Sequence, residues 1–277
     1  SHVSYNFIME KIRRLFLVCI IIILGYIVLR LFFVSNNSKY TFMVSHRGAA
    51  GLAPENTLAS INAAINQGAK YIEFDVQRSA DGVLLLMHDL RLSRTTPSEG
   101  FVNEMTWAKL QSTDAGSHFS PQFVSETIPS LKQVLEATSN YEGILVIELK
   151  NPNLYPGIEE QVLREIQIYS VSQKIIVVSF DYISLRRILE YSPKTPIGLL
   201  SIYPYDLPHL QDRQIVAVHW LSVLLDPTLV YRLHAADYQV WAWTVNSPQL
   251  FDVIKNLQVQ AIVTDRPDLW NHAASGR

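Results

Sequence analysis

Residues 144–179 read ILVIELKNPNLYPGIEEQVLREIQIYSVSQKIIVVS, and this stretch sets the pattern for most of the chain. Two apolar, β-branched runs at 144–149 and 175–179 flank a helix-like stretch at 158–169. A strand, a helix and a second strand in this order are typical of a parallel strand pair joined by a helical crossover. The stretch therefore predicts one unit of an α/β fold.

The same alternation extends over residues 40–277. We expect strands at nine apolar runs: 41–45, 71–76, 83–87, 144–149, 175–179, 197–200, 215–219, 239–244 and 261–264. We expect helices at 57–67, 130–139, 158–169, 181–191, 227–236 and 247–257, with Asp181 as an N-cap and Pro248 in a first turn. The length of this stretch favours a closed (β/α)8 TIM barrel. Because few residues separate the second and third runs, no helical crossover fits there, and we expect the barrel to be irregular near strands 2 and 3.

Composition excludes several classes of protein. The 277 residues are 48% hydrophobic and 17% charged, which is too apolar for a disordered chain. Lys and Arg number 23 against 25 Asp and Glu, so the basic excess typical of a nucleic-acid binder is missing. With Cys19 as the single cysteine, neither an intrachain disulfide nor a cysteine zinc cluster can form. The sequence contains no P-loop, GxGxxG, HExxH or GxSxG motif.

The N-terminal part of the sequence has a different character. Residues 15–34 form a run of 20 residues whose only charge is Arg30, and about 20 apolar residues span a bilayer as a helix. A signal peptide is less favoured, because its apolar region usually covers about 7–15 residues and a small-residue cleavage site follows it. Lys11, Arg13 and Arg14 precede the run, so the positive-inside rule places the N-terminus in the cytoplasm. The sequence thus predicts a cytoplasmic tail (1–14), a transmembrane helix (15–34), a linker (35–39) and an extracytoplasmic barrel domain (40–277).

Acidic residues lie on two predicted strands near the ends where parallel barrels place their chemistry. Glu73 and Asp75 are two residues apart and so share one face of the second strand, and Glu148 lies near the end of the fourth. Carboxylates among apolar neighbours are costly unless they are paired or bind a metal. Three carboxylates are oxygen ligands that suit Mg²⁺ or Ca²⁺.

Two histidines and two cations follow the same strand ends. His46 and Arg47 end the first strand, His88 ends the third, and Lys150 follows the fourth. Histidine can act as a general acid or base near neutral pH, and Arg or Lys can bind phosphate oxygens. Together with the carboxylates, these groups are what metal-assisted cleavage of a phosphodiester requires. We expect four further residues to brace the site or line its pocket: Glu55, Asn56, Asp89 and Trp243.

These stretches resemble the glycerophosphodiester phosphodiesterase family from about residue 43 to 269. The matching segments are HRGAAGLAPENT (46–57), YIEFDVQRSADG (71–82), LLMHDLRLSRTT (85–96), IPSLKQVL (128–135), IELKNP (147–152), VWAWTVN (240–246) and VTDRPD (263–268). The resemblance implies a (β/α)8 barrel, one divalent cation, Mg²⁺ or Ca²⁺, and hydrolysis of glycerophosphodiesters to sn-glycerol 3-phosphate and an alcohol. It further implies an acid–base pair (His46 and His88), metal ligands (Glu73, Asp75 and Glu148) and phosphate contacts (Arg47 and Lys150).

Several alternatives stay open at this point. The reaction can proceed through a cyclic phosphate formed by the substrate's own glycerol hydroxyl, or by direct attack of water, and either histidine can be the base. A lysophospholipase D that takes lysolipids from the bilayer is a second candidate, with Phe101, Trp107, Phe119 and Phe123 as a possible acyl groove. A non-catalytic binding barrel is a third, although such proteins usually lose a histidine or a metal carboxylate. The expected partners are a small-molecule substrate and, through the N-terminal helix, a membrane; no nucleic-acid or protein partner is predicted.

Overall fold

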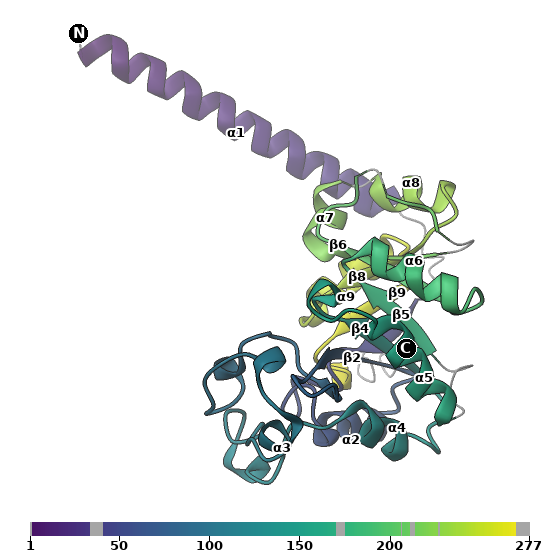
Figure 1. The fold of residues 1–277 in the computed structure, drawn as a ribbon. Coiled ribbons are helices and arrows are strands. Elements are labelled where there is room, and N and C mark those ends of the chain that lie inside the picture. The colour runs from purple at the N-terminus through teal and green to yellow at the C-terminus, as the bar shows by residue number, and fades with distance from the viewer. Residues whose placement is uncertain are drawn as a thin grey trace.

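The structure is a computed structural model that describes residues 2–33, 41–169, 175–205, 207–210, 214–226 and 228–269. Its centre is a closed barrel of eight parallel strands (Figure 1). In order around the barrel these are β1 (Phe42–Ser45), β2 (Tyr71–Arg78), β4 (Ile144–Leu149), β5 (Ile175–Ser179), β6 (Ile197–Ser201), β7 (Ile215–His219), β8 (Gln239–Trp243) and β9 (Ala261–Thr264). The barrel closes because β1 pairs with both β9 and β2. The predicted TIM barrel is confirmed.

Helices surround the strands, and all six that the sequence predicts are present. They are α2 (Leu58–Asn66), α4 (Leu131–Ala137), α5 (Ile158–Ile168), α6 (Tyr182–Tyr191), α8 (Leu229–Ala235) and α9 (Pro248–Asn256). Asp181 caps α6 as expected, because its side chain accepts hydrogen bonds from the backbone N–H groups of Ile183 and Ser184. A further helix, α7 (Trp220–Leu225), was not predicted. Its apolar residues directly follow those of strand β7. The change from the two-residue period of a strand to the helical period of about 3.6 residues therefore cannot be recognised in the sequence.

The interior of the barrel is filled at the end where the strands begin. Phe42 stacks on Tyr71 with ring centroids 4.2 Å apart, and Trp241 meets Phe42 edge to face at 5.6 Å. Above these rings, small and branched side chains such as Val146 and Val178 point inward. The barrel is therefore closed at this end, and a pocket can open only where the strands end.

The third strand departs from the parallel pattern, at the place where the sequence predicts an irregular barrel. β3 (Leu84–Leu86) is antiparallel to β2 and lies outside the closed barrel. The hairpin carries the chain beyond the rim and back again, so that the N–H of Met87 donates to the carbonyl of Asp75 at 3.1 Å. Residue 88 therefore returns to the level of the β2 carboxylates. His88 reaches the site because the strand is antiparallel, not because it ends a barrel strand.

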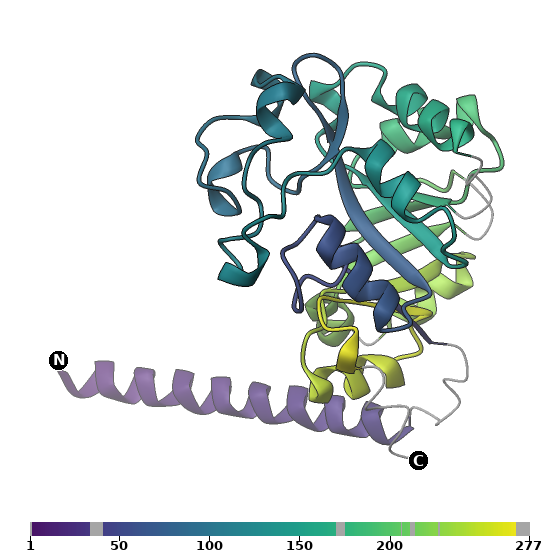
Figure 2. The same ribbon diagram turned by 90° about the horizontal axis from the view of Figure 1, so that it is seen from below.

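Residues 87–127 form a lobe beside the barrel, which both ribbon views show (Figures 1 and 2). The lobe contains helix α3 (Trp107–Leu110) and short 3-10 turns at Leu92–Arg94, Val102–Glu104 and Pro121–Phe123. A small hydrophobic core joins the lobe to Leu85 of β3 and to Ile128, and its members within the lobe are Met87, Leu92, Val102, Leu110 and Ala115. The lobe is thus packed separately from the barrel helices.

The N-terminal segment forms helix α1 (His2–Phe33). Within the described part of the chain, no helix has an apolar stretch long enough to cross a bilayer. The predicted transmembrane helix over 15–34 is therefore not supported. The side chains of residues 27–33 in this helix and the predicted linker at 35–39 lie outside what the structure describes.

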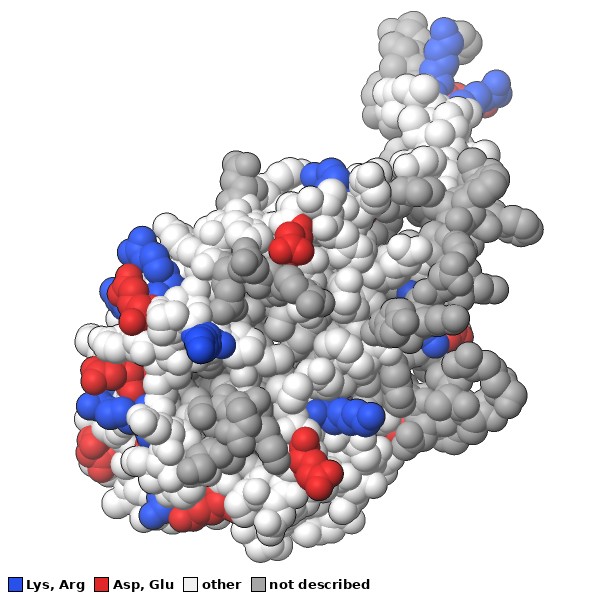
Figure 3. All heavy atoms as spheres, turned by 90° about the vertical axis from the view of Figure 1, so that its right-hand side faces the viewer, with Lys and Arg blue, Asp and Glu red and all other residues white. Residues whose placement is uncertain are grey.

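Charged side chains are interspersed on the outer surface. Figure 3 shows Lys and Arg next to Asp and Glu over the face that it presents. Some charged residues on the described helices form pairs one helical turn apart, such as Arg164 with Glu160 and Arg186 with Glu190. This mixture of signs matches the balanced composition of the sequence.

Candidate active site

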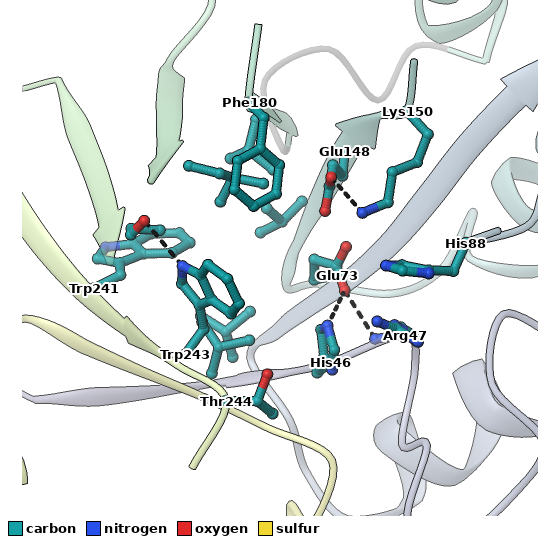
Figure 4. A pocket seen from close by; sticks show the side chains of 16 residues that line it. His46, Arg47, Glu73, His88, Glu148, Lys150, Phe180, Trp241, Trp243 and Thr244 are labelled. Atoms are coloured by element: carbon teal, nitrogen blue, oxygen red, sulfur yellow. Dashed lines mark hydrogen bonds and ion pairs between the residues drawn. The ribbon is translucent and has the colours of Figure 1, made fainter. Parts of the chain in front are cut away.

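A pocket of about 190 Å³ opens at the end of the barrel where the strands terminate (Figure 4). One half is polar and is built from the ends of β1, β2, β4 and the β3 hairpin. The other half is apolar and is built from β5 to β9. The lining residues are Val44, His46, Arg47, Glu73, His88, Val146, Glu148, Lys150, Val178, Phe180, Leu200, Ala217, Trp241, Trp243, Thr244 and Val263. The structure therefore brings six of the seven predicted site residues to one cavity, and the seventh, Asp75, lies directly behind it.

The three carboxylates converge because of the register between neighbouring strands. Asp75 of β2 is paired with Glu148 of β4, and Glu73 lies two residues earlier on the same face. Each contributes a carboxylate oxygen, and the three oxygens lie within 4.8 Å of one another. All three side chains are buried. Since the residues come from strands that the β3 hairpin separates in sequence, only the barrel pairing places them together.

The electrostatics of this cluster favour a bound cation. Burial and the neighbouring Asp75 and Glu148 raise the pKa of Glu73 well above its usual value. Burial and Asp75 likewise raise the pKa of Glu148 to about 8. Glu73 Oε1 is buried and has no hydrogen-bond partner among the described residues. A divalent cation would supply both the missing charge and the missing partner, so the three carboxylates fit a metal site.

Two cations compensate part of the negative charge. Lys150 Nζ lies 2.5 Å from Glu148 Oε1 and 3.2 Å from Asp75 Oδ1. Arg47 Nε lies 3.5 Å from Asp75 Oδ2. Burial opposes the charged form of Asp75, but Lys150 and Arg47 together hold the pKa of this carboxyl below its usual value. Asp75 is therefore the carboxylate that stays ionised.

The loop after β1 places Arg47 by an unusual backbone conformation. Arg47 and Gly48 both have positive φ, at 50° and 80°. A Cβ at position 48 would meet Ser60 Oγ at 2.3 Å, so the turn requires glycine there. The turn directs the backbone N–H of Arg47 to Glu73 Oε2 at 2.8 Å. Asn56 closes the same loop, because its side-chain amide donates to Asp75 Oδ2 at 2.7 Å and accepts from the backbone N–H of Asp75.

His46 is held from the barrel side. Its Nδ1 lies 2.6 Å from Asp265 Oδ1, and Asn246 donates to the other carboxylate oxygen of Asp265 at 2.5 Å. His46 Nε2 faces the pocket, 3.9 Å from Glu73 Oε2. Neither Asp265 nor Asn246 is predicted from the sequence to be a site residue, although both follow predicted strands. Their position after neighbouring strands β8 and β9 was the available signal.

His88 is held from the lobe side. Its Nδ1 lies 2.6 Å from Asp89 Oδ1, and Arg94 Nε donates to Asp89 Oδ2. Burial lowers the pKa of His88, which favours the neutral ring near pH 7. Figure 4 shows both imidazole rings directed toward the space beside Glu73. The two histidines thus approach one region from the barrel and from the lobe.

The apolar half of the pocket is formed mainly by aromatic and branched side chains. Trp243 lines it and donates its indole N–H to the carbonyl of Ala217 at 2.9 Å, so Trp243 is a wall of the cavity. Phe180 meets Trp243 edge to face at 5.8 Å. The aromatic residues that the sequence suggested for an acyl groove lie in the lobe instead, and none of them is among the described residues that line this pocket: Phe101, Trp107, Phe119 and Phe123.

Comparison with known proteins gives consistent matches. The model of the glycerophosphoryl diester phosphodiesterase family matches residues 46–269. A glycerophosphodiester phosphodiesterase of Caldanaerobacter subterraneus is 33% identical over 233 residues, covering 82% of this chain and 95% of the relative. The putative glycerophosphodiester phosphodiesterase YhdW of Bacillus subtilis is 35% identical over 234 residues, with 82% and 95% covered. The solved structure of an Oleispira antarctica phosphodiesterase in complex with the product sn-glycerol 3-phosphate has a TM-score of 0.76 and 31% identity, covering 86% and 98%.

Proposed function

The chain belongs to the glycerophosphoryl diester phosphodiesterase family, and from this we propose that it hydrolyses glycerophosphodiesters to sn-glycerol 3-phosphate and an alcohol. One observation carries the proposal: three buried carboxylates, two cations and two oriented histidines meet in a single pocket. The similar phosphodiesterase of Oleispira antarctica was solved with sn-glycerol 3-phosphate as its product, which supports the same substrate class here.

Arg47 and Lys150 bind the phosphate in this proposal, because both are cations at the border of the pocket. Arg47 donates through a planar fork that matches phosphate oxygens, whereas Lys150 acts as a compact point charge. Both already lie beside Asp75, so their positions are fixed before substrate arrives. The phosphate is thereby placed between the two histidines and next to the carboxylate cluster.

His46 and His88 exchange protons with the substrate. A carboxylate at 2.6 Å from each Nδ1 requires an N–H at that atom, so each neutral ring presents an unprotonated Nε2 to the pocket. One ring removes a proton from the attacking hydroxyl, which belongs to the substrate's glycerol or to water. The other ring, protonated, gives its proton to the departing alcohol. Both assignments of the two rings satisfy this geometry.

Glu73, Asp75 and Glu148 would hold one divalent cation. A metal held by these three carboxylates would supply Lewis-acid polarisation of a phosphoryl oxygen and would neutralise charge that grows in the transition state. We propose Mg²⁺ or Ca²⁺, because the cluster offers only carboxylate oxygens and the chain has no cysteine near it.

The proposal is tested with the full chain on glycerophosphocholine, with and without EDTA. We expect release of glycerol 3-phosphate that depends on the metal and is lost in His46→Ala. His118→Ala is the matched control, since His118 is exposed in the lobe and away from the pocket. A metal-replete, folded protein without turnover would leave a binding barrel as the better description.

Lysophospholipids are a second candidate substrate, and the apolar half of the pocket favours them. Phe180, Leu200 and Trp243 offer a surface that an acyl chain can contact without leaving polar groups unpaired. The same assay with lysophosphatidylcholine distinguishes the two, because cleavage of the head group releases lysophosphatidic acid. A rate on lysophosphatidylcholine above that on glycerophosphocholine would favour the lipid substrate.

We also propose that the N-terminal run 15–34 attaches the enzyme to a membrane, with residues 40–277 on the extracytoplasmic side. The support is the apolar length of the run and the three cations before it, Lys11, Arg13 and Arg14. Extraction of membranes with alkaline carbonate tests the attachment, and a C-terminal reporter tests the side. Release of the protein by carbonate, or a reporter active only in the cytoplasm, would contradict the proposal.

A further inference from the structure

One arginine outside the pocket connects both halves of the polar site. Arg94 stands at the end of the first 3-10 turn of the lobe. Its two terminal nitrogens donate to the two oxygens of Glu55 at 2.7 and 2.8 Å, and its Nε donates to Asp89. Arg94 therefore uses all three of its nitrogens on two carboxylates.

Each of these carboxylates also holds a residue that lines the pocket. Glu55 accepts from Arg47 at 2.8 Å, and Asp89 lies 2.6 Å from His88 Nδ1. The result is a continuous chain of contacts, which we call the Arg94 relay: His88, Asp89, Arg94, Glu55 and Arg47. It runs from the ring of one histidine in the lobe to the guanidinium that faces Asp75 in the barrel.

The backbone near His88 is fixed in another way. Gln77 of β2 donates its side-chain amide to the carbonyls of Met87, His88 and Asp89. These bonds set the path of the chain but leave the imidazole torsions undetermined. The orientation of the His88 ring depends on its contact with Asp89 Oδ1. Arg94 Nε donates to the other oxygen, Asp89 Oδ2, and so fixes the orientation of the carboxylate without competing with His88.

We propose that Arg94 is a positioning residue that fixes the His88 ring and the Arg47 guanidinium relative to each other. The proposal rests on the function given above. Arginine is required at this position, because its two terminal nitrogens bind Glu55 while its Nε binds Asp89 in another direction. Lysine keeps the charge at this position but cannot make the paired contact with Glu55.

The test compares Arg94→Met and Arg94→Lys with Arg91→Met. Arg91 is a matched control, since it lies in the same segment and pairs with Glu99 at 2.7 Å, but both side chains are mostly exposed and neither contacts the relay. We expect Arg94→Met to lower kcat about 10–100-fold, the range typical when a residue that orients a site residue is lost. Arg94→Lys should recover only part of this loss, and Arg91→Met should match the parent protein.

A double-mutant cycle separates positioning from general destabilisation. If Arg94 acts partly through Asp89, the double variant Arg94→Met with Asp89→Asn loses less kcat than the product of the two single losses, and the remaining loss reports the branch through Glu55 and Arg47. Mn²⁺ affinity, measured by calorimetry, should stay within about twofold of the parent protein in Arg94→Met, because no metal ligand has changed. Fully multiplicative effects in the cycle, or an unchanged kcat in Arg94→Met, would overturn the proposal.

A measurement without substrate tests the positioning role of Arg94 independently of the proposed phosphodiesterase reaction. The ¹⁵N chemical shifts of the His88 ring report which nitrogen carries the proton. In the parent protein they should show one tautomer, with the proton on Nδ1, and in Arg94→Met a mixture of both. If the parent protein had no phosphodiesterase activity, this change would still be observed. An identical single tautomer in Arg94→Met would refute the positioning role.

Discussion

The barrel and the lobe each supply one histidine, and they hold it by different means. His46 follows strand β1, and its partner Asp265 follows the neighbouring strand β9, so the hydrogen-bonded sheet sets their distance. His88 has its partner in the next residue, and the ion pairs of Arg94 fix that partner to the barrel. The first arrangement depends on backbone pairing between residues 219 positions apart. The second depends on side chains that are partly exposed, so we expect it to be the easier one to disturb.

The largest expected effect concerns the two histidines themselves. His46→Ala and His88→Ala should each lower kcat by about 10²–10⁴-fold, the usual contribution of a general acid or base. Because the two rings act in the same step, the double variant should lose less than the product of the single losses. Steady-state kinetics on glycerophosphocholine measure all three variants. A loss in His88→Ala below tenfold would mean that the lobe contributes only a wall of the pocket.

A cavity in each core tests whether the two regions unfold separately. Leu92 is fully buried in the lobe and Ile188 is fully buried in α6, and truncation of such side chains to alanine costs about 2–5 kcal/mol. We expect Leu92→Ala to increase hydrogen exchange in the lobe while the barrel amides keep their protection. Ile188→Ala should lower the protection of the barrel as well. Equal loss throughout the chain in Leu92→Ala would show a single cooperative unit.

The partners of the two histidines allow a matched comparison. Asp265→Asn and Asp89→Asn each remove the negative charge from an Nδ1–H contact, and each should lower kcat about 10–100-fold. We expect added salt to reduce the kcat of the parent protein mainly through the lobe contacts, because the ion pair of Arg94 with Asp89 is more exposed, and so more strongly screened, than the contact of His46 with Asp265. The salt dependence of kcat should therefore persist in Asp265→Asn and weaken in Asp89→Asn, which loses the link to His88 but keeps the ion pair between Arg94 and Glu55. The reverse pattern would place the screened contact in the barrel.

The same contrast explains what the sequence could predict. Local patterns predict the nine strands, the six helices and the seven site residues. The period of the apolar residues and the polar residues at the ends of apolar runs can both be recognised in the sequence. The meeting of Asp75 with Glu148 follows once the barrel is assumed. Arg94 could not be found in this way, since its role depends on the lobe folding back onto the loop of Glu55. Asp265 was visible at a strand end, but its distance to His46 depends on barrel closure between β1 and β9.

The smallest expected effect per step, about tenfold in metal affinity per pH unit and titrating carboxyl, concerns the carboxylate cluster of the barrel. The pKa of Glu148 is raised to about 8, first by burial and then by Asp75, against 4.5 for an ordinary glutamate. A carboxyl whose pKa is raised by folding contributes its full stabilisation at pH values below its pKa in the unfolded chain. This contribution is lost as the pH rises through the pKa in the folded state, here about 8. The pKa of Glu73 is shifted in the same direction, whereas that of Asp75 is lowered and titrates below this window.

The metal-free protein should therefore have a Tm that falls as the pH rises from about 5 to 8. A divalent cation takes the place of these protons, so metal affinity should rise about tenfold per pH unit for each of the two carboxyls, Glu148 and Glu73, that must lose a proton, and level off once both are ionised. Melting curves of the EDTA-treated protein and Mn²⁺ calorimetry at pH 6, 7 and 8 measure both trends. Glu148→Gln serves as the control, because residue 148 then has no proton to lose and both slopes should decrease to the part that Glu73 contributes. A Tm that rises with pH in the metal-free parent protein would mean that the cluster is already ionised, and that Lys150 and Arg47 neutralise it without a metal.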